Sequence, residues 1–110
     1  MPTGENAKAQ YMYVMYPMDP SKAANPELWT AEDHQSFNLH WNRLEQATKE
    51  GVVLGAGRAQ DDGAEPAIVL FESESQAEAT RFFESEPFIT RGFATARLHP
   101  SHIALSRNEP

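Results

Sequence analysis

Apolar residues along this chain gather into four short runs that have the composition of β-strands. The first run, residues 11–16, contains three tyrosines, two methionines and one valine, and it stops before Pro17. Similar runs follow at residues 52–57, 67–71 and 93–98. The run at 67–71 is apolar at every position, as expected of a strand that is covered on both faces. We therefore expect four strands, and residues 103–105 could add a short edge strand.

Between the first two runs the chain has the periodicity of a helix. Thr30 and Asp33 match the capping box, in which two side chains satisfy backbone NH groups at the first turn of a helix. The apolar residues that follow are spaced by three or four positions: Phe37, Trp41, Leu44 and Ala47. Gly51 can adopt the left-handed conformation that ends a helix. A helix at residues 31–50 is therefore expected, with His40 at the flank of its apolar stripe.

A second helix is expected after the third strand. Ser73 and Gln76 match another capping box, and the helix would continue to Ser85. Its buried face would consist of Ala79, Phe82 and Phe83. Glu86 continues this face in the last turn, so its carboxylate should point inward, and Pro87 should end the helix before a turn at residues 88–92. The alternative is that Pro87 kinks the chain and turns Glu86 into solvent.

The expected order of elements is β-α-β-β-α-β, the split βαβ arrangement of the ferredoxin-like fold. The fold class is therefore α+β, with two helices on one face of an antiparallel sheet. We expect a single domain at residues 10–105, because one domain is the usual content of a chain of 110 residues. The polar residues 1–9 and 106–110 are expected to form a disordered arm and a disordered tail.

The strands at residues 11–16 and 67–71 carry apolar residues on both of their faces. Since the two helices cover only one face of the sheet, the other face needs a second cover. We therefore expect a homodimer whose subunits pack sheet to sheet. The alternative is a monomer with an exposed apolar face, although large exposed apolar patches are uncommon in monomers.

The connection between the first strand and the first helix is long and contains three prolines. Structureless connections of this length are uncommon in a compact domain and often form lids or binding loops. The segment at residues 17–31 is therefore a candidate to border a site. The alternative is a plain surface loop that Leu28 and Trp29 hold in place.

Charge and composition exclude several classes of function. The net charge is −7, and the chain lacks the clustered basic residues that binding to nucleic acid requires. Cysteine is absent, which excludes disulfides, thiol nucleophiles and thiolate metal sites. We find neither a secretory signal nor the run of about 20 apolar residues that spans a membrane. The expectation is a cytoplasmic protein that binds neither nucleic acid nor a membrane.

His40 and Glu86 are the strongest candidates for a chemical site. An imidazole titrates near neutral pH, and a carboxylate beside it fixes its tautomer and raises its basicity. An inward-facing carboxylate would in turn be stabilised by an imidazolium partner. Because the two helices should lie on the same sheet, we expect these side chains to form a pair. The alternative for His40 is a histidine that a nearby carbonyl group or water satisfies.

Other side chains could bind a ligand. Tyr13, Trp29 and Trp41 are candidates to line a pocket, and the alternative for each is plain packing in the core. Arg58 could anchor an anionic group of a substrate, or it could be a solvated surface charge. These four residues are the expected substrate-binding set.

Neither a metal nor a cofactor is expected. His34 and His40 are six residues apart and point to different sides of a helix, so they cannot share one ion. His99 and His102 face opposite sides of an extended chain. The glycines at 55–57 lack the rest of a nucleotide-binding loop, because no third glycine and no following helix accompany them.

A series of short motifs runs through the chain: the strand at 13–16, the segment His40-Trp41-Asn42-Arg43-Leu44 before Gly51, Gly57 after the second strand, Phe71-Glu72-Ser73, Glu86-Pro87-Phe88, and Gly92 before the closing strand. In the order and spacing of these motifs over residues 11–105, the chain resembles the YCII-related (YciI-like) family of small dimeric α+β barrels. The resemblance also implies a likeness in fold to muconolactone isomerase, and the family includes a dehydrochlorinase of chlorinated hydroquinones.

The resemblance implies an active site made of a histidine and an acid. His40 stands at the place of the family's histidine, and Glu86 at the place of the aspartate in an Asp-Pro-Tyr/Phe motif. Glutamate is one methylene longer than aspartate. The segment at residues 17–31 is longer than the usual connection in the family, which would reshape the entrance of a pocket.

Together these features predict a cofactor-free acid–base enzyme of the lyase, isomerase or dehydrohalogenase kind. The substrate would be a small cyclic organic molecule, and His40 and Glu86 would move the proton. The alternative is a dimeric module without catalysis that binds a small ligand or assists another enzyme. A third hypothesis is a cofactorless oxygenase of the same barrel type.

Overall fold

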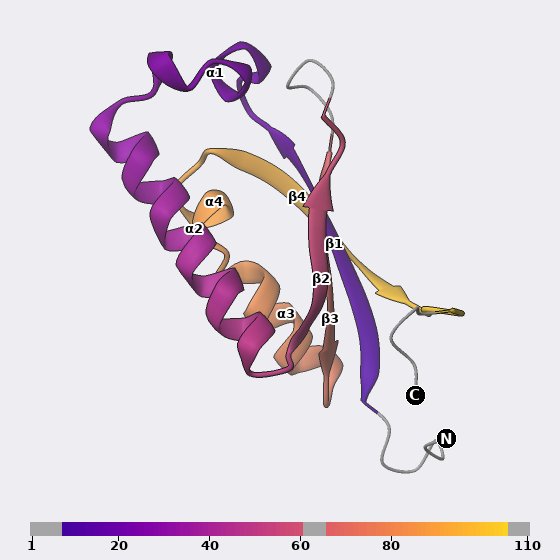
Figure 1. The fold of residues 1–110 in the computed structure, drawn as a ribbon. Coiled ribbons are helices and arrows are strands. Elements are labelled where there is room, and N and C mark those ends of the chain that lie inside the picture. The colour runs from indigo at the N-terminus through magenta and orange to yellow at the C-terminus, as the bar shows by residue number, and fades with distance from the viewer. Residues whose placement is uncertain (1–7, 61–65, 106–110) are drawn as a thin grey trace.

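Four strands form one antiparallel sheet in the computed structural model, which describes residues 8–60 and 66–105. The strands are β1 (Ala9–Pro17), β2 (Val53–Arg58), β3 (Ala67–Ser73) and β4 (Ala94–Ser101), and their order in the sheet is β2-β3-β1-β4. The two main helices are α2 (Ala31–Lys49) and α3 (Gln76–Glu84). Both lie on the same side of the sheet (Figure 1). The predicted α+β class and the ferredoxin-like β-α-β-β-α-β order are confirmed.

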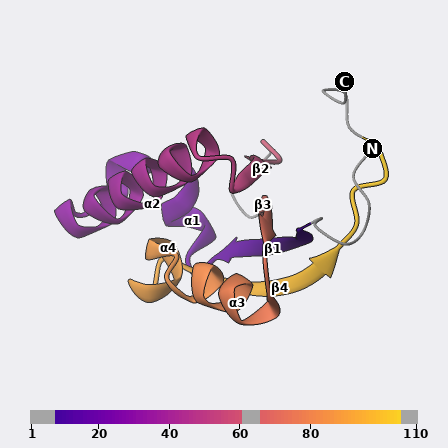
Figure 2. The same cartoon turned by 90° about the horizontal axis from the view of Figure 1, so that it is seen from below.

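Three short helical segments complete the described chain. Helix α1 (Pro20–Ala24) and the 3-10 helix η1 (Pro26–Leu28) occupy the long connection before α2, and α4 (Pro87–Thr90) follows α3. A view from below shows α2 towards the β2 edge and α4 towards β4 (Figure 2). The predicted tail and residues 1–7 of the predicted arm lie outside the described residues, whereas Ala9, which the sequence assigns to the arm, belongs to β1.

Several predicted boundaries are wrong; β1, for example, begins at Ala9 and includes Pro17. Ser75, not Ser73, caps α3, because β3 continues through Ser73 and the Ser75 hydroxyl accepts the hydrogen bond from the backbone NH of Glu78. Residues 103–105 form no strand, because β4 itself pairs along β1 as far as Gln10 and Ser101. Beyond that point the side chain of Gln10 accepts the hydrogen bond from the NH of Ile103 at 2.7 Å.

The buried face of α2 differs from the expected apolar stripe. The capping box at Thr30 and Asp33 is present as predicted. The buried residues of the helix, however, are Ser36, His40, Leu44 and Ala47. Phe37 is 38% exposed and Trp41 is 54% exposed. Ser36 and His40 turn inward because each meets a polar side chain there, Ser36 that of Arg91 and His40 that of Glu86. The buried face of α2 is therefore more polar than the periodicity of the sequence indicates.

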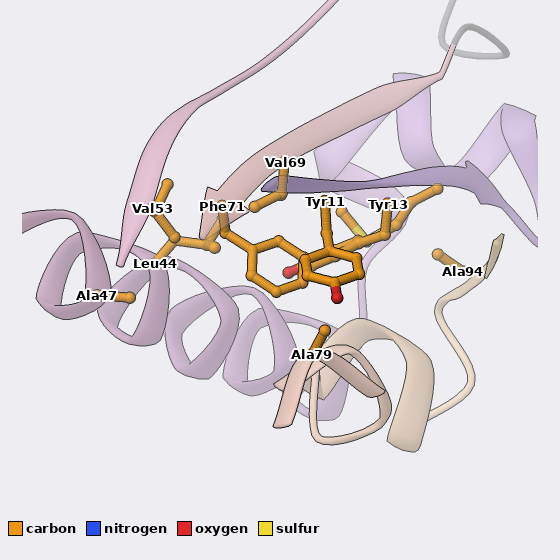
Figure 3. Packing of buried hydrophobic residues seen from close by; sticks show 10 residues of the cluster. Tyr11, Tyr13, Leu44, Ala47, Val53, Val69, Phe71, Ala79 and Ala94 are labelled. Atoms are coloured by element: carbon orange, nitrogen blue, oxygen red, sulfur yellow. The ribbon is translucent and has the colours of Figure 1, made fainter. Parts of the chain in front are cut away.

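The core lies between the sheet and the helices. Alternate residues of β1 and β3 face α2 and α3, and α3 brings Ala79 against them (Figure 3). The residues that form this core are Tyr11, Tyr13, Met15, Leu44, Ala47, Val53, Val69, Phe71, Ala79 and Ala94. Tyr13 and Phe71 are completely buried, and their rings meet edge to face with centroids 5.9 Å apart. This core anchors the strand from which Tyr13 reaches the candidate site.

Candidate active site

His40 and Glu86, which are 46 positions apart in the chain, lie in direct contact. The Nδ1 atom of His40 and the Oε2 atom of Glu86 are 2.6 Å apart. His40 is 8% exposed and Glu86 is completely buried. A hydrogen bond this short between an imidazole and a carboxylate is typical of a charge-assisted pair. The structure therefore brings together the two residues that sequence reasoning selected.

The sequence predicts that Glu86 lies in the last turn of a helix, and this prediction is wrong. Helix α3 ends at Glu84, and Ser85 caps its C-terminus. Glu86 is instead the N-cap of α4, and its Oε2 atom accepts a hydrogen bond from the NH of Phe88 at 3.0 Å. Pro87 both ends one helix and begins the next, because proline is favoured at the first helical position. The carboxylate thus meets a backbone donor instead of the negative end of a helix.

The other carboxylate oxygen of Glu86 has two further partners. The hydroxyl group of Tyr13 donates to Oε1 at 2.7 Å, and Nη1 of Arg43 lies 3.5 Å from the same atom. Nη1 makes no hydrogen bond to the described residues, whereas Nη2 donates to the carbonyl of Phe82 and to the hydroxyl of Ser85. The guanidinium group also lies 4.1 Å from the centre of the Phe82 ring. Three side chains and one backbone amide therefore surround one buried carboxylate.

Arg43 was not selected from the sequence. The signal that would have found it is its position three residues after His40, since residues three apart share a helix face. Tyr13 was selected to line a pocket, but its hydroxyl group donates a hydrogen bond to Oε1 of Glu86 at 2.7 Å. Both residues hold the carboxylate and do not reach the space beside His40.

The contacts of Glu86 decide its charge. Burial disfavours ionisation, but the hydrogen bond and the charge of His40, the hydroxyl of Tyr13 and the amide of Phe88 together hold the pKa of Glu86 below its ordinary value. Burial, followed by the charge of Glu86 and the hydrogen bond to it, raises the pKa of Tyr13 far above its ordinary value. The carboxyl group is therefore ionised and the phenol protonated at neutral pH.

His40 is held so that one ring nitrogen is available to a ligand. Nδ1 is engaged with Glu86, and this leaves Nε2 for an incoming group. The imidazole stacks on the ring of Phe88 with centroids 4.0 Å apart and an interplanar angle of 13°. Contacts on two sides thus fix both the tautomer and the orientation of the imidazole.

A cavity of about 220 Å³ opens beside His40. Its walls come from α2, from the three strands β1, β2 and β3, and from Phe88 of α4. Trp41 and Arg58, both expected to bind a substrate, line this cavity together with His40. An apolar cavity of about 150 Å³ holds a benzene molecule, so the volume suits a small ring with substituents.

A second cavity of about 130 Å³ lies next to the first. Trp29 lines it, as expected for a residue of the long connection before α2. The indole NH of Trp29 donates to the carbonyl of Lys22 at 2.8 Å, and its ring meets that of Phe93 with centroids 5.5 Å apart. Of the two residues that could hold the loop in place, Trp29 makes these contacts, whereas Leu28 is 57% exposed.

No metal centre is built from the described residues. In residues 8–60 and 66–105 no three histidine, aspartate or glutamate side chains come together as ligands for an ion. His34 contacts the Trp29 ring, whereas His99 lies on β4 and is exposed. None of the helices in these ranges combines the length and the hydropathy of a membrane span.

Comparisons with known proteins agree with the fold of this chain. The family model of the YCII-related domain matches residues 9–99. No curated protein matches the chain. Among solved structures, the 5-chloro-2-hydroxyhydroquinone dehydrochlorinase of Burkholderia phenoliruptrix AC1100, in complex with 2,5-dihydroxybenzoquinone, matches with a TM-score of 0.58. The two chains are 16% identical over 84% of this chain and 93% of that one, which establishes a shared fold.

Proposed function

This chain belongs to the YCII-related domain family, and from that premise we propose that it is a cofactor-free acid–base enzyme of the lyase or isomerase kind. His40 is the group that moves the proton, and Glu86 orients the imidazole and stabilises its charged form. The substrate is a small cyclic organic molecule that occupies the cavity beside His40. The observation that carries the proposal is the 2.6 Å contact between the two side chains at the wall of this cavity.

The burial of Glu86 assigns the two roles. Glu86 is fully buried and lines neither cavity, so it cannot act directly on a ligand. His40 lines the cavity and has its Nδ1 atom bound to the carboxylate. Proton transfer therefore takes place at Nε2, and the carboxylate stabilises the imidazolium that forms.

The reaction begins when Nε2 removes a proton from a carbon or a hydroxyl group of the substrate ring. In an elimination, the leaving group, such as chloride, is on a saturated ring carbon, as in a keto tautomer of a chlorinated hydroquinone. The electron pair of the broken bond moves into the ring, a double bond forms at that carbon, and chloride departs. In an isomerisation, the imidazolium returns its proton to a different atom of the same molecule. A base positioned in this way contributes about 10²–10⁴-fold to the rate.

The structural neighbour supports the substrate class. That protein is a dehydrochlorinase and was solved with 2,5-dihydroxybenzoquinone, a single substituted ring. A ring of this size suits the volume of the cavity beside His40. At 16% identity the neighbour contributes the fold and a class of compounds to test, while the assignment of residues rests on the contacts of His40.

An assay with the neighbour's substrate class tests this proposal. Chloride release from 5-chloro-2-hydroxyhydroquinone and deuterium exchange into 2,5-dihydroxybenzoquinone would be measured for the wild type and for His40→Ala. We expect the variant to lose about 10²–10⁴-fold in rate, because the proton acceptor is gone. His102→Ala, an exposed histidine that lies away from the cavity, is the matched control. Equal rates for the wild type and His40→Ala would contradict the proposal.

A module that binds a ligand without catalysis is the second candidate. This candidate is favoured because the carboxylate of Glu86 also has a structural role: it caps α4 and accepts a hydrogen bond from Tyr13. For such a module, Glu86→Gln would leave the affinity for 2,5-dihydroxybenzoquinone unchanged, and none of the variants above would alter a rate.

We also propose that two copies of the chain pair through the uncovered face of the sheet. On this face β1 and β3 present five apolar side chains: Met12, Val14, Tyr16, Ile68 and Leu70. All five are exposed or only partly buried, while the residues that alternate with them form the core. A second copy would bury this face and double the apolar core.

A further inference from the structure

The two cavities beside α2 are adjacent and share part of their walls. They share five wall residues, namely Met15, Phe37, Arg58, Ala67 and Phe88. The larger cavity extends from this shared wall to His40, and the smaller one extends to Trp29 and Phe93. A ligand that spans the shared wall would contact His40 at one end and Trp29 at the other, so we call the two cavities the arms of one crevice.

The shared wall is apolar except for one residue. Arg58 is the last residue of β2, and among the described residues that line both cavities it is the one that carries a charge. A guanidinium group presents a planar set of NH donors that matches a carboxylate or a phenolate. In a chain with a net charge of −7, an anionic ligand is repelled at long range, so a local cation decides whether it is retained.

The second arm is small, apolar and rigidly walled. Trp29 is held by its hydrogen bond to Lys22 and by the ring of Phe93. Ala23 of α1 lines this arm and does not line the arm of His40. The volume of about 130 Å³ suits a short alkyl chain or a compact second group.

We propose that the crevice is built for an aromatic or quinonoid ring that carries an anionic substituent and an apolar side group. The ring lies beside His40 and Phe88, the anionic group is bound by Arg58, and the side group extends under Trp29. This assignment rests on the proposed function for the reacting end of the ligand. It adds a specificity for charge and for length, which residues outside the His40–Glu86 pair determine.

Benzoate, benzyl alcohol and 4-butylbenzoate separate these features, and their binding can be measured by titration calorimetry without any turnover. We expect benzoate to bind at least tenfold tighter than benzyl alcohol, because only benzoate offers a charge to Arg58. Each methylene of the butyl group that enters the second arm should add about threefold to fourfold in affinity. Equal affinities for benzoate and benzyl alcohol, or no binding of any of the three probes at millimolar concentration, would overturn the inference.

Two pairs of variants test the residues. Arg58→Gln should weaken benzoate about tenfold and leave benzyl alcohol unchanged, whereas Arg97→Gln, an exposed arginine on β4, should change neither. Ala23→Leu should fill the second arm and remove the gain from the butyl group without affecting benzoate. Ala24→Leu, on the exposed side of α1, is its control. If Arg58→Gln binds benzoate as tightly as Arg97→Gln does, Arg58 does not bind the anionic group. If Ala23→Leu keeps the gain from the butyl group as Ala24→Leu does, the butyl group does not enter the second arm.

The same titrations with His40→Ala separate this inference from the proposed function. If the probes bind this variant with the same dependence on Arg58, the crevice is selective as proposed, whatever the assays of proton transfer show. If the wild type catalyses exchange but its substrates bind equally well to Arg58→Gln, the proposed function stands and the inference fails.

Discussion

At the scale of single residues, the candidate site is organised around one buried charge. The carboxylate of Glu86 takes hydrogen bonds from Tyr13 and from the amide of Phe88, and it contacts Nδ1 of His40. A charge that is removed from water needs partners of this kind, because an unpaired buried carboxylate is strongly unfavourable. The contacts that keep Glu86 ionised are therefore the same contacts that fix the imidazole in one orientation.

The lowered pKa of Glu86 predicts how the free energy of unfolding depends on pH. Since the pKa in the folded state lies below the ordinary value of 4.5, the unfolded chain takes up the proton first as the pH falls. The contribution of the ionised carboxylate is thus fully present above pH 4.5 and is lost as the pH falls below it. We expect Glu86→Gln to be less stable than the wild type by about 2–4 kcal/mol at pH 7, and this difference to narrow in acid.

Urea unfolding at a series of pH values measures this difference. Glu84→Gln, which changes an exposed carboxylate at the end of α3, is the matched control and should follow the wild type at each pH. A gap between wild type and Glu86→Gln that stays constant from pH 7 to pH 3 would show that the carboxylate is not ionised in the folded protein.

At the scale of elements, three parts of the fold position the site. Helix α2 carries His40 and Arg43 on one face, the strand β1 supplies Tyr13 from the sheet, and the α3–α4 junction supplies Glu86. The junction matters most, because Pro87 and the cap of α4 turn the carboxylate towards α2. The segment with α1 and η1 adds Trp29 and closes the far end of the crevice.

The N-terminal cap of α2 can be tested by itself. Thr30 accepts a hydrogen bond from the NH of Asp33, and the side chain of Asp33 accepts one from the NH of Thr30. We expect Thr30→Ala to lower the free energy of unfolding by about 1 kcal/mol, because a backbone donor of the first turn loses its partner. Thr30→Ser keeps the hydroxyl and should stay within a few tenths of a kcal/mol of the wild type, as measured by urea unfolding. Equal losses in both variants would contradict a role of the hydroxyl group as the cap.

At the scale of the whole molecule, the sheet has one covered and one uncovered face. Helices α2 and α3 cover the face that forms the core (Figure 1). The apolar side chains of the other face, centred on Val14 and Leu70 of neighbouring strands, have no cover in the described part of the chain. This arrangement is the basis for the proposed pairing of two copies.

The proposed pairing predicts the mass of the particle in solution. Light scattering coupled to gel filtration should give twice the chain mass of 12.3 kDa for the wild type. Val14→Glu should give a folded monomer, because a charge in the middle of the apolar face makes its burial unfavourable. Asn38→Glu, on the exposed side of α2, should remain a dimer and is the control. A wild type that is monomeric at micromolar concentration would disprove the pairing.

Local signals in the sequence determined the class, the order of elements and most of their positions. These signals are the apolar runs of the strands, the cap at Thr30 and the glycine at position 51 that ends α2. They depend on residues that are close to each other in the sequence, so they can be read from the sequence alone. Gly51 indeed has a positive φ of 84°. Periodicity indicates that the side chain of Glu86 points inward, and the family resemblance pairs it with His40. The structure confirms that the two side chains are in contact.

Only the tertiary structure decided how the site is supported. Periodicity counts apolar residues, so it placed Phe37 and Trp41 on the buried face of α2, although polar partners turn Ser36 and His40 inward there. It could not show that Glu86 begins a helix instead of ending one. It could not show either that two cavities meet at Arg58. These features depend on contacts between distant segments, and such contacts form only when the sheet and helices pack together.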